Sequence, residues 1–436
     1  MIIIMLSIDD LKFQNIEKDG LTYLRISIYK YFYHDILKND FTNDVGEFEI
    51  TEEKTGNIKF NVNDEDSSMK KLDRHVRSIK TKLTNSINGN DSYYFDDDLR
   101  LPLVGLNCIG ILDKGSEMIE IKPLTGCNAN CSFCSVDEGP SSKKKIDYIV
   151  DKDFLVNSLN DVLNIKKTKM SVWINPHGEP LLYNKIAELV DDILKLNYVK
   201  DIHIVTNGLL LNPDLVDEFV RIQNERNKEI IISISISGLG TEKCEKSKFN
   251  KDGKSISKLM MGDNYNIDLV IKNTTYASQN MDIVITPVVI HKINDSEMED
   301  IVLFAKHLQT KTKFNVKVGI QKFCKNKKGR NIGKEIEWDT FFKWLKDLEI
   351  KTDFELTSEL GKLEKTEELP VPCHKGEIIK VRIIADGRYK IDKIGLYENP
   401  VGNRTVVILN CKATHGFTKA QVIASKHNII VCKQGK

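Results

Sequence analysis

The chain has 436 residues, and at about 150 residues per domain this length allows two or three folded units. Hydrophobic residues make up 41% and charged residues 29%, with 25 Gly and 10 Pro, a composition that excludes collagen-like and disordered chains. The 64 Lys and Arg nearly cancel the 63 Asp and Glu. A net charge of +1 argues against a global surface for nucleic acid or anionic membrane.

The N-terminus and the cysteine content indicate the compartment. The apolar start at residues 1–6 soon reaches Asp9 and Asp10 and has no basic segment, so we expect no signal peptide. No run approaches about 18 apolar residues, so no membrane span is predicted. Nine cysteines without an export signal favour metal binding or catalysis in a reducing compartment, and we expect a cytoplasmic protein.

Residues 1–115 alternate short apolar runs with polar stretches and predict an N-terminal region of unclear role. From Met118 onward, short β-branched runs alternate with amphipathic stretches, a pattern typical of βα units that build a parallel sheet. The predicted strands are Met118 to Leu124, Met170 to Asn175, Asp201 to Asn207, Glu229 to Ser237, Met281 to Ile290 and Phe314 to Lys322.

Apolar residues at helical spacing predict helices over residues 154–163 and 186–194 between these strands. A third helix is predicted after Asn212, a good capping residue, with Pro213 at its first position. Five or six βα units are too few for an eight-stranded barrel. We therefore predict an α/β fold in which residues 116–325 form an open, partial (β/α)6 barrel.

The C-terminal third changes in character. Residues 326–371 predict a helical linker with an aromatic-rich helix around Trp338 to Leu348. Residues 372–436 predict a small closed or half-closed β domain, with a hairpin turn at Asp386-Gly387 between its first two strands. Its expected strands are Glu377 to Ile384, Tyr389 to Leu396, Arg404 to Leu409, Ala420 to Ile423 and Asn428 to Cys432.

Three cysteines carry the clearest chemical signal. Cys127, Cys131 and Cys134 form a C-x3-C-x2-C motif directly after a predicted strand. A [4Fe–4S] cluster held by three thiolates leaves one iron open for another ligand, whereas structural zinc normally closes its tetrahedron with four. The motif therefore favours a cluster with an open iron. The alternative is a zinc loop completed by a distant cysteine, or three incidental cysteines.

At these residues the sequence resembles the radical S-adenosylmethionine (SAM) superfamily, whose cluster motif has this spacing and an aromatic residue before the last cysteine, here Phe133. The resemblance implies a [4Fe–4S] cluster on the three cysteines, with SAM bound to the open iron. It also implies one-electron cleavage of SAM to a 5′-deoxyadenosyl radical, in a site that positions this intermediate and excludes water.

Further matches lie at the ends of successive predicted strands. After the second strand, His177-Gly178-Glu179 resembles the Gly-Gly-Glu segment that contacts the SAM amino group in this superfamily. His177 replaces the first glycine, which leaves the backbone approach at that position open. A partner for a nearby loop carbonyl is an equally good interpretation of His177.

The third strand ends at Asn207, and the fourth carries Ser233, Ser235 and Ser237 at alternate positions that face one side. By the same resemblance, Asn207, Ser235 and Ser237 are candidate SAM contacts. The alternative is that serine is tolerated between close-packed strands. Residues 285–290 of the fifth strand would contact adenine, although core packing explains them as well.

Within the superfamily, the wording of residues 122–140 and 147–151 resembles methanogenesis marker protein 10. That family comprises cobalamin-dependent radical SAM enzymes that C-methylate an arginine in the α subunit of methyl-coenzyme M reductase. The resemblance implies cobalamin as a cofactor, a small C-terminal domain that forms most of its site, and methyl transfer to the arginine δ carbon, giving 5-methylarginine. It implies that protein subunit and an electron donor as partners, with nucleic acid and membrane not expected.

Tyr148 lies fourteen residues after Cys134, in the loop expected to cover the cluster. A phenolate can ligate iron. We hypothesise that Tyr148 reaches the open iron when SAM is absent. The alternative is a packing tyrosine before the first helix.

Four cysteines in the last third, whose spacing matches no local finger motif, form a candidate second iron or zinc site. They are Cys324, Cys373, Cys411 and Cys432. Small buried thiols are an equally good interpretation, and Cys108 and Cys244 are expected to be structural. The basic run from Lys322 to Arg330 is a candidate substrate-facing or phosphate-facing loop, although a solvated face is commoner.

Two other functions remain open. A radical SAM tRNA-modifying enzyme of the methylthiotransferase kind also joins a partial barrel to a small β domain, but it carries an additional N-terminal cysteine set. Here Cys108 is the one cysteine before the motif, and the net charge supplies no tRNA-sized basic field. A non-catalytic, metal-stabilised scaffold is the alternative from another class.

Overall fold

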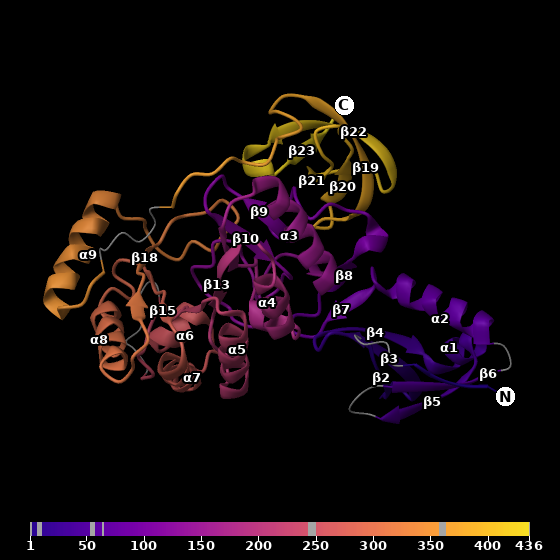
Figure 1. The fold of residues 1–436 in the computed structure, drawn as a ribbon, viewed down its shortest axis with the longest axis horizontal. Coiled ribbons are helices and arrows are strands. Elements are labelled where there is room, and N and C mark those ends of the chain that lie inside the picture. Colours follow the sequence, from indigo (N-terminus) through magenta and orange to yellow (C-terminus); the bar gives the residue numbers. More distant parts are fainter. Residues whose placement is uncertain are drawn as a thin grey trace.

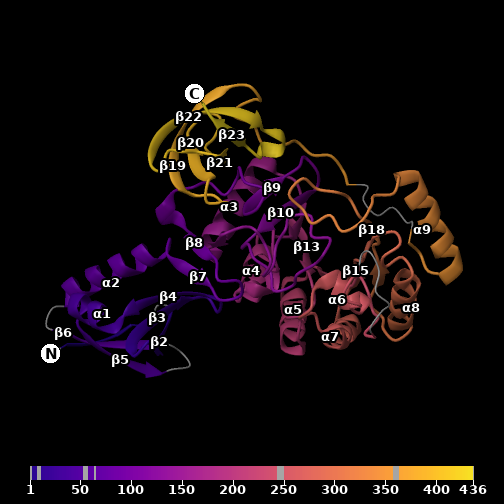
Figure 2. The ribbon, with the colours of Figure 1, turned by 180° about the vertical axis from the view of Figure 1, so that it is seen from behind.

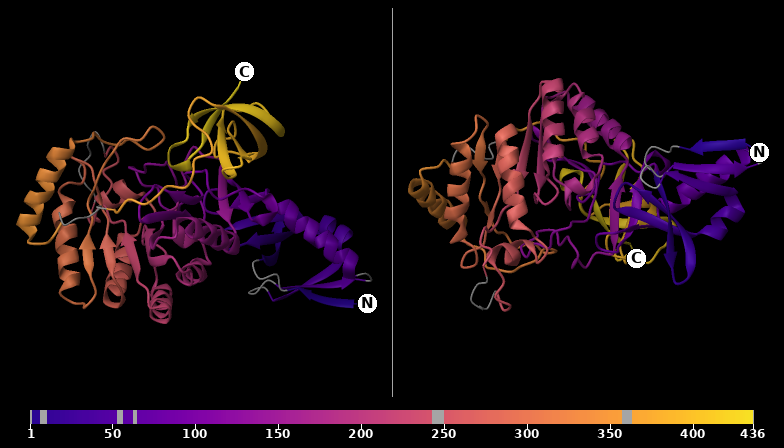
Figure 3. Two further views of the ribbon diagram at one scale, coloured as in Figure 1. Left: turned by 45° about the horizontal axis from the view of Figure 1, so that its top comes forward. Right: turned by 90° about the horizontal axis from the view of Figure 1, so that it is seen from below.

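In the computed structural model, the residues described are 2–435 except 7–10, 53–56, 63–64, 243–249 and 357–362. Cys244, expected to be structural, lies outside them. Figure 1 shows a central sheet with its helices, a β-barrel above it, and N-terminal sheets extending to one side. The view from behind and two further views show that the N-terminal sheets and the helix α9 (Trp338–Thr352) lie at opposite ends of the molecule (Figures 2 and 3).

The central sheet has seven strands in the order β17-β15-β14-β13-β12-β10-β9. All neighbours pair in parallel except β9, which is antiparallel to β10. This confirms the expected partial (β/α)6 barrel. The strands are β9 (Gly110–Asp113), β10 (Met118–Lys122), β12 (Met170–Ile174), β13 (Val199–Thr206), β14 (Ile230–Ile234), β15 (Ile283–Ile285) and β17 (Val316–Val318).

Helices cover the outer face of this sheet, and local sequence explains where they begin. In the third predicted helix, Asn212 accepts a hydrogen bond from the Leu215 amide and Pro213 occupies the first turn, as expected. Asp151 caps the first in the same way, through Phe154. The helices are α3 (Lys152–Lys166), α4 (Ile186–Leu194), α5 (Pro213–Arg226), α6 (Ile256–Met261), α7 (Ile267–Asn280) and α8 (Glu297–Gln309).

Two predicted strands are each split in the structure. The run from Met281 to Ile290 breaks after β15, where Pro287 lacks a backbone donor, and resumes as β16 (Val288–Val289). The last predicted strand resumes after β17 as β18 (Gln321–Lys322), which pairs with β16. Both short strands lie beyond the carboxyl ends of the sheet and extend one wall of the site described below.

The N-terminal region forms two sheets. The larger has the order β11-β8-β7-β4-β3-β2, and its edge strand β11 (Ile146–Val150) comes from beyond the cysteine motif and pairs in parallel with β8. A small sheet has the order β1-β6-β5. The other elements are β1 (Ile2–Leu6), β2 (Leu11–Lys18), β3 (Leu21–Ile28), β4 (Phe32–Leu37), α1 (Lys38–Val45), β5 (Glu47–Glu52), β6 (Asn57–Val62), α2 (Glu65–Ile79), β7 (Leu83–Asn85) and β8 (Asp91–Phe95).

The C-terminal strands close a barrel in the order β19-β20-β21-β23-β22 around buried aliphatic side chains such as Val381, Ile408 and Val422. This confirms the small C-terminal β domain, which follows the predicted aromatic-rich helix, α9 (Trp338–Thr352). The strands are β19 (Ile378–Asp386), β20 (Lys393–Tyr397), β21 (Arg404–Leu409), β22 (Gly416–Ala424) and β23 (Val431–Gln434), and 3-10 turns lie at Asp97–Leu99, Pro180–Leu182 and Lys426–Asn428.

The hairpin between β19 and β20 differs from the expected tight turn at Asp386-Gly387. It is a loop over residues 387–392, closed by a hydrogen bond from the Gly387 amide to the Asp392 carbonyl. The extra length carries Arg388 into the interior, a placement that matters for the site. In the described part of the chain, no helix has the length and apolar character needed to cross a bilayer.

Candidate functional site

The three motif cysteines lie in the connection from β10 to β11, here called the cysteine loop, residues 123–145. Backbone amides point at two of the sulfurs: Ala129 N lies 3.4 Å from Cys127 Sγ, and Glu138 N lies 3.3 Å from Cys134 Sγ. Such donors favour the thiolate form that binds metal. The loop therefore has the donor set and local polarity that a cluster with three cysteine ligands needs.

In the absence of a metal, burial instead favours the protonated form of the Cys127 and Cys131 thiols. Burial, with added repulsion from neighbouring thiolate charge, raises the pKa of Cys127 well above its usual range and that of Cys131 to about 12. The thiolates thus need a positively charged partner, and iron would supply it. Across the described residues, no three His, Cys, Asp or Glu side chains gather tightly enough for a single metal ion.

A buried carboxylate ties the cysteine loop to the ends of two strands. Glu179, after β12, accepts hydrogen bonds from Thr206 Oγ1 at 2.6 Å and from the Asn207 amide at 2.8 Å. The Asn207 side-chain amide then donates to Asn128 Oδ1 at 2.8 Å and lies 3.7 Å from Cys127 Sγ. Burial raises the pKa of Glu179 to about 7. These residues hold the first cysteine in place.

Gly178 is required by close backbone approach. It forms a bridge with Gly126 of the cysteine loop, and a Cβ at position 178 would lie 2.2 Å from the Gly126 carbonyl oxygen. His177, next to it, accepts the Gly126 amide through its own carbonyl at 3.3 Å. The backbone approach left open by the His177 replacement is therefore made through the main chain of this residue.

We expect Gly178→Ala to displace the cysteine loop, destabilise the protein by about 1–3 kcal/mol and lower iron incorporation. Iron content after anaerobic reconstitution measures the effect, together with the unfolding midpoint. Gly319→Ala is the matched control, because the nearest atom to a Cβ there is 3.7 Å away. Equal iron contents for the two variants would contradict the proposed close approach.

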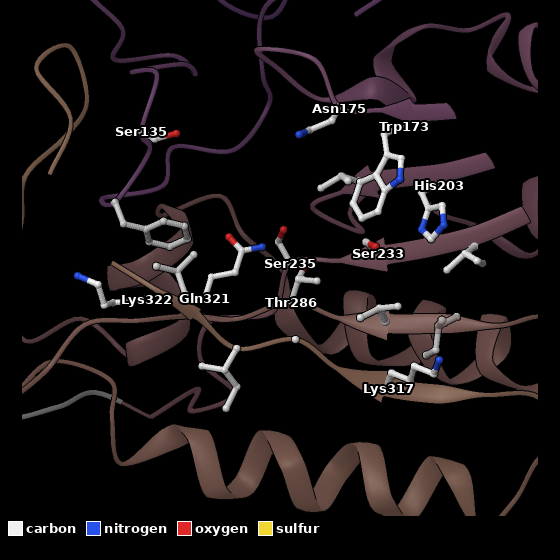
Figure 4. Close-up of a pocket in the computed structure, with 18 of the residues that line it drawn as sticks. Ser135, Trp173, Asn175, His203, Ser233, Ser235, Thr286, Lys317, Gln321 and Lys322 are labelled. Carbon is white, nitrogen blue, oxygen red and sulfur yellow. The ribbon is translucent and has the colours of Figure 1, made fainter. Parts of the chain in front are cut away.

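A large cavity of about 820 Å³ occupies the inner face of the central sheet (Figure 4). On β12, β13 and β14 alternate residues line it, such as Trp173, His203 and Ser233, whereas Val172, Ile204 and Ile232 are fully buried. Cys131, Phe133 and Cys134 line one part of the cavity. Elsewhere in its wall Trp173 stacks on His203, with ring centroids 4.3 Å apart and planes 6° from parallel. The cysteine loop thus opens on a space large enough for a cofactor and part of a substrate.

The predicted SAM contacts separate into two groups. Phe133 and Ser235 line the cavity, as does Ser233. Gly178, Glu179 and Asn207 are instead engaged in the contacts that hold the cysteine loop. Their direct contact with SAM stays a prediction.

Ser237 differs from the expectation. Its hydroxyl accepts the Val288 amide at 3.0 Å, its carbonyl accepts Asn294 Nδ2 at 2.7 Å, and the residue is fully buried. The physical reason is that β14 ends at Ile234, so the alternation of a strand does not continue to position 237. Ser237 thus fixes the start of β16 and does not line the cavity.

Tyr148 also differs. It lies in β11, not in a loop, and its hydroxyl donates to the Asp386 carbonyl oxygen at 2.9 Å. Its ring packs against Phe95 and Tyr93 and is fully buried. The strand pairing with β8 turns this side chain toward the C-terminal barrel, so the structure does not bring the phenol to the cysteines.

The four cysteines proposed for a second metal site are not brought together. Cys324 is exposed and lines the large cavity, whereas Cys373, Cys411 and Cys432 are buried in the core of the C-terminal barrel. Burial raises the pKa of Cys373 to about 11 and that of Cys432 to about 12, as for small buried thiols. Cys373, Cys411 and Cys432 therefore fit the alternative interpretation, in which they are small buried thiols of the barrel core.

The C-terminal barrel does not offer an internal site for cobalamin. Its interior is filled by the buried core, including Ile379, Val406 and Ile430. A corrin would have to bind outside the barrel. The expectation that this domain forms most of a cobalamin site therefore does not fit its packed interior.

Sequence reasoning missed Arg388, which the 387–392 loop carries into the cysteine loop. Its Nη2 donates to Glu138 Oε2 and to Asp147 Oδ1, both at 2.9 Å, and all three side chains are at least nine-tenths buried. Burial opposes the charge, but the two carboxylates outweigh it and raise the pKa of Arg388. No local pattern signals this pairing, because its partners are some 240 residues apart.

Comparison with known proteins is consistent with this geometry. Residues 121–305 match the family model described as "Radical SAM superfamily". An uncharacterized protein of Methanocaldococcus jannaschii, MJ0103, is 28% identical over 388 residues, covering 82% of this chain and 83% of that protein. The region that the family model matches includes the cysteine loop and strands β12 to β15 of the central sheet.

Other similar proteins match a part of the chain. A GTP 3',8-cyclase of Clostridium botulinum is 27% identical over 209 residues, which cover 47% of this chain and 58% of that protein. A GTP 3',8-cyclase of Alkaliphilus oremlandii is 27% identical over 274 residues, 61% of this chain and 77% of that protein. A solved structure titled "Native anSMEcpe with bound AdoMet and Cp18Cys peptide" has a TM-score of 0.35 and 18% identity, covering 53% of this chain and 58% of its own.

Proposed function

We propose that this protein, supported by the comparisons as a radical SAM enzyme, binds a [4Fe–4S] cluster through Cys127, Cys131 and Cys134 and cleaves SAM in the adjoining cavity. The observation that carries the proposal is the position of Cys131 and Cys134 at one wall of an 820 Å³ cavity, with Cys127 on the same loop and with amide donors aimed at the sulfurs of Cys127 and Cys134. The bound cluster and SAM would supply the radical, and the protein's residues hold the cysteine loop and enclose the space.

The finer proposal is a cobalamin-dependent C-methylation of an arginine in the α subunit of methyl-coenzyme M reductase. It is supported by the wording of residues 122–140 and 147–151. An sp3 carbon lacks the nucleophile that polar SAM methylation needs, so a radical enzyme is the class suited to it. The cavity wall carries Asp282 and the indole of Trp173, an acidic and an aromatic group of the kinds that bind a guanidinium.

Arginine recognition is compatible with the contacts of Asp282. Its Oδ1 accepts the Asn315 amide at 2.9 Å and its Oδ2 accepts Asn315 Nδ2 at 2.6 Å, so the carboxylate is held in one orientation. Each carboxylate oxygen retains a lone pair for a further donor. A substrate arginine would find a fixed acceptor at this wall of the cavity.

The experiment that tests the finer proposal is the visible spectrum of the anaerobically reconstituted protein after incubation with hydroxocobalamin and gel filtration. We expect a stoichiometric corrin spectrum alongside the iron–sulfur band, followed by methylation of an arginine peptide. An iron–sulfur band without corrin would remove the methylation chemistry. Because its relatives include GTP 3',8-cyclases, GTP would then be tested as a substrate, together with tRNA.

Deoxyadenosine formation separates this class from a scaffold. A metal-stabilised scaffold would hold iron but would leave SAM intact in the presence of dithionite. A radical SAM enzyme supplied with a substrate that donates a hydrogen atom releases 5′-deoxyadenosine and methionine under the same conditions. Absence of SAM cleavage by a fully loaded cluster would therefore overturn the proposed function as a whole.

A further inference from the structure

The chain from Gln321 to Arg330 passes between two cavities. Residues 321–324 and Asn326 line the large cavity, whereas residues 327–330 line a second one of about 570 Å³. The cysteine loop separates the same two spaces, since Cys134 and Ser135 face the first while Asp137 and Lys143 face the second. The cysteine loop thus has one side toward the proposed reaction space and another toward residues 327–330.

Residues 329 and 330 contact the cysteine loop directly. The Arg330 amide donates to the Cys134 carbonyl oxygen at 2.8 Å, and its Nη1 donates to the Cys131 carbonyl oxygen at 3.0 Å. Nη1 also donates to Asn130 Oδ1 at 2.8 Å, while Nε donates to Asp137 Oδ1 at 2.8 Å and Nη2 to the Glu138 carbonyl oxygen at 2.9 Å. One hydrogen bond therefore connects the wall of the second cavity to each of two cluster cysteines.

The second cavity is basic. Lys143, Lys327 and Lys328 line it and are exposed, and none of the three forms an ion pair with a carboxylate of the described chain. The two acidic residues in its wall are already engaged: Asp137 pairs with Arg330, and Asp392 Oδ1 accepts the Asn410 amide at 3.0 Å. On a chain whose net charge is +1, this is a local positive surface, here called the lysine patch.

Aromatic and apolar side chains complete the wall. Tyr389 lies under Lys328, whose Nζ is 4.8 Å from the ring centroid, and Ile391 and Leu409 also line the cavity. A concave surface with a few apolar groups and a cationic rim has the composition of a binding surface for a protein of opposite charge.

We propose that the lysine patch, formed by Lys143, Lys327 and Lys328, is the docking surface of an acidic one-electron donor protein. This inference rests on the proposed function, because a [4Fe–4S] cluster must receive one electron before SAM is cleaved. The reduced donor loses one electron, the cluster gains it, and no proton is transferred. Docking behind the cysteine loop admits the electron while the large cavity stays occupied by cofactor and substrate.

The size and charge of the patch agree with such a partner. Complexes between redox proteins are small and transient, and charge complementarity mainly raises their association rate. The main chain of Gly329 and Arg330 lies between the patch and Cys134, so a docked donor is separated from the cysteine by one residue and one hydrogen bond.

The test uses the full chain with its reconstituted cluster and, as probe, a reduced flavodoxin of strongly negative charge. Cluster reduction is followed by stopped-flow absorbance in wild type and in the triple variant Lys143→Glu, Lys327→Glu, Lys328→Glu. The control, Lys311→Glu, Lys313→Glu, Lys343→Glu, changes three exposed lysines on the α8–β17 connection and α9 by the same net charge. Dithionite, which needs no docking surface, is the second reductant.

We expect the patch variant to be reduced by flavodoxin about 10- to 100-fold more slowly than wild type, with the control variant unchanged. Wild-type reduction should slow as salt is added, and dithionite should reduce all three proteins equally. Equal rates of reduction by flavodoxin for the two triple variants would overturn the docking proposal. If in that case the patch variant had lost binding to tRNA, the lysine patch would be a surface for nucleic acid and not for the donor. A wild-type cluster that dithionite reduces without SAM cleavage would overturn the proposed function.

Discussion

Replacement of Cys127, Cys131 or Cys134 by alanine is expected to abolish cluster assembly and reduce SAM cleavage to background. The three thiols lie on one short loop, and four other thiols of the described chain are buried elsewhere: Cys108 in the main core, and Cys373, Cys411 and Cys432 inside the C-terminal barrel. A cluster deprived of one thiolate has no substitute ligand from these residues. Iron and sulfide content, the visible spectrum and deoxyadenosine formation measure the loss.

Cys324→Ser is the matched control for these variants. Cys324 is exposed and lines the same cavity as Cys131 and Cys134, but it is not part of the cysteine loop. We expect it to retain full iron content and SAM cleavage. Deoxyadenosine formation by any of the three alanine variants would contradict the cluster assignment, and loss of iron in Cys324→Ser would show that the ligand set extends beyond the motif.

The second large effect is expected for Arg388→Met, which leaves the buried Glu138 with Lys144 alone and removes the cation paired with the buried Asp147. The exposed fractions of these carboxylate side chains are 3% and 0%, so water cannot replace the lost charge. Breaking a buried pair from one side costs about 3–5 kcal/mol, which is more than a hundredfold in a local opening equilibrium. Hydrogen exchange of the 387–392 loop and of the cysteine loop, measured by mass spectrometry, reports the change.

Lys390→Met tests whether burial is the cause. This residue is in the same loop, but its pair with Asp91 is 3.8 Å long and the side chains are 68% and 63% exposed. Exposed pairs contribute about 0–1 kcal/mol, so exchange should stay near that of wild type. Equal protection from hydrogen exchange in Arg388→Met and Lys390→Met would show that the buried contacts of Arg388 with Glu138 and Asp147 do not hold the barrel against the cysteine loop.

The sequence predicts the central unit well because its signals are local. Hydrophobic periodicity gives the βα units, and Asn212 and Pro213 mark a helix start through contacts within one turn. The cysteine spacing and the Gly178-Glu179 segment lie at strand ends, where a parallel sheet gathers side chains from successive strands. The fold class and the place of the cysteine loop follow from these patterns.

What the sequence does not predict depends on long-range pairing. Strand β11 joins a sheet whose neighbour, β8, is some fifty residues earlier, and this pairing alone turns Tyr148 away from the cysteines. Arg388 and Arg330 act on the cysteine loop across 190 residues or more. The prediction for Ser237 is wrong because β14 ends three residues before it, so the alternation of a strand does not reach this position. None of these placements leaves a periodic or motif signal.

The strand exchange at β11 has a consequence for how the chain can be divided. Residues 146–150 leave the central unit, complete the N-terminal sheet beside β8, and return to start α3. A fragment beginning near residue 116 would keep every motif residue but would leave β11 without its partner strand β8, and an unpaired strand edge favours aggregation. The N-terminal region carries no motif of its own, but its strand β8 pairs with β11 and so holds the C-terminal end of the cysteine loop. Trimming for crystallisation should begin elsewhere.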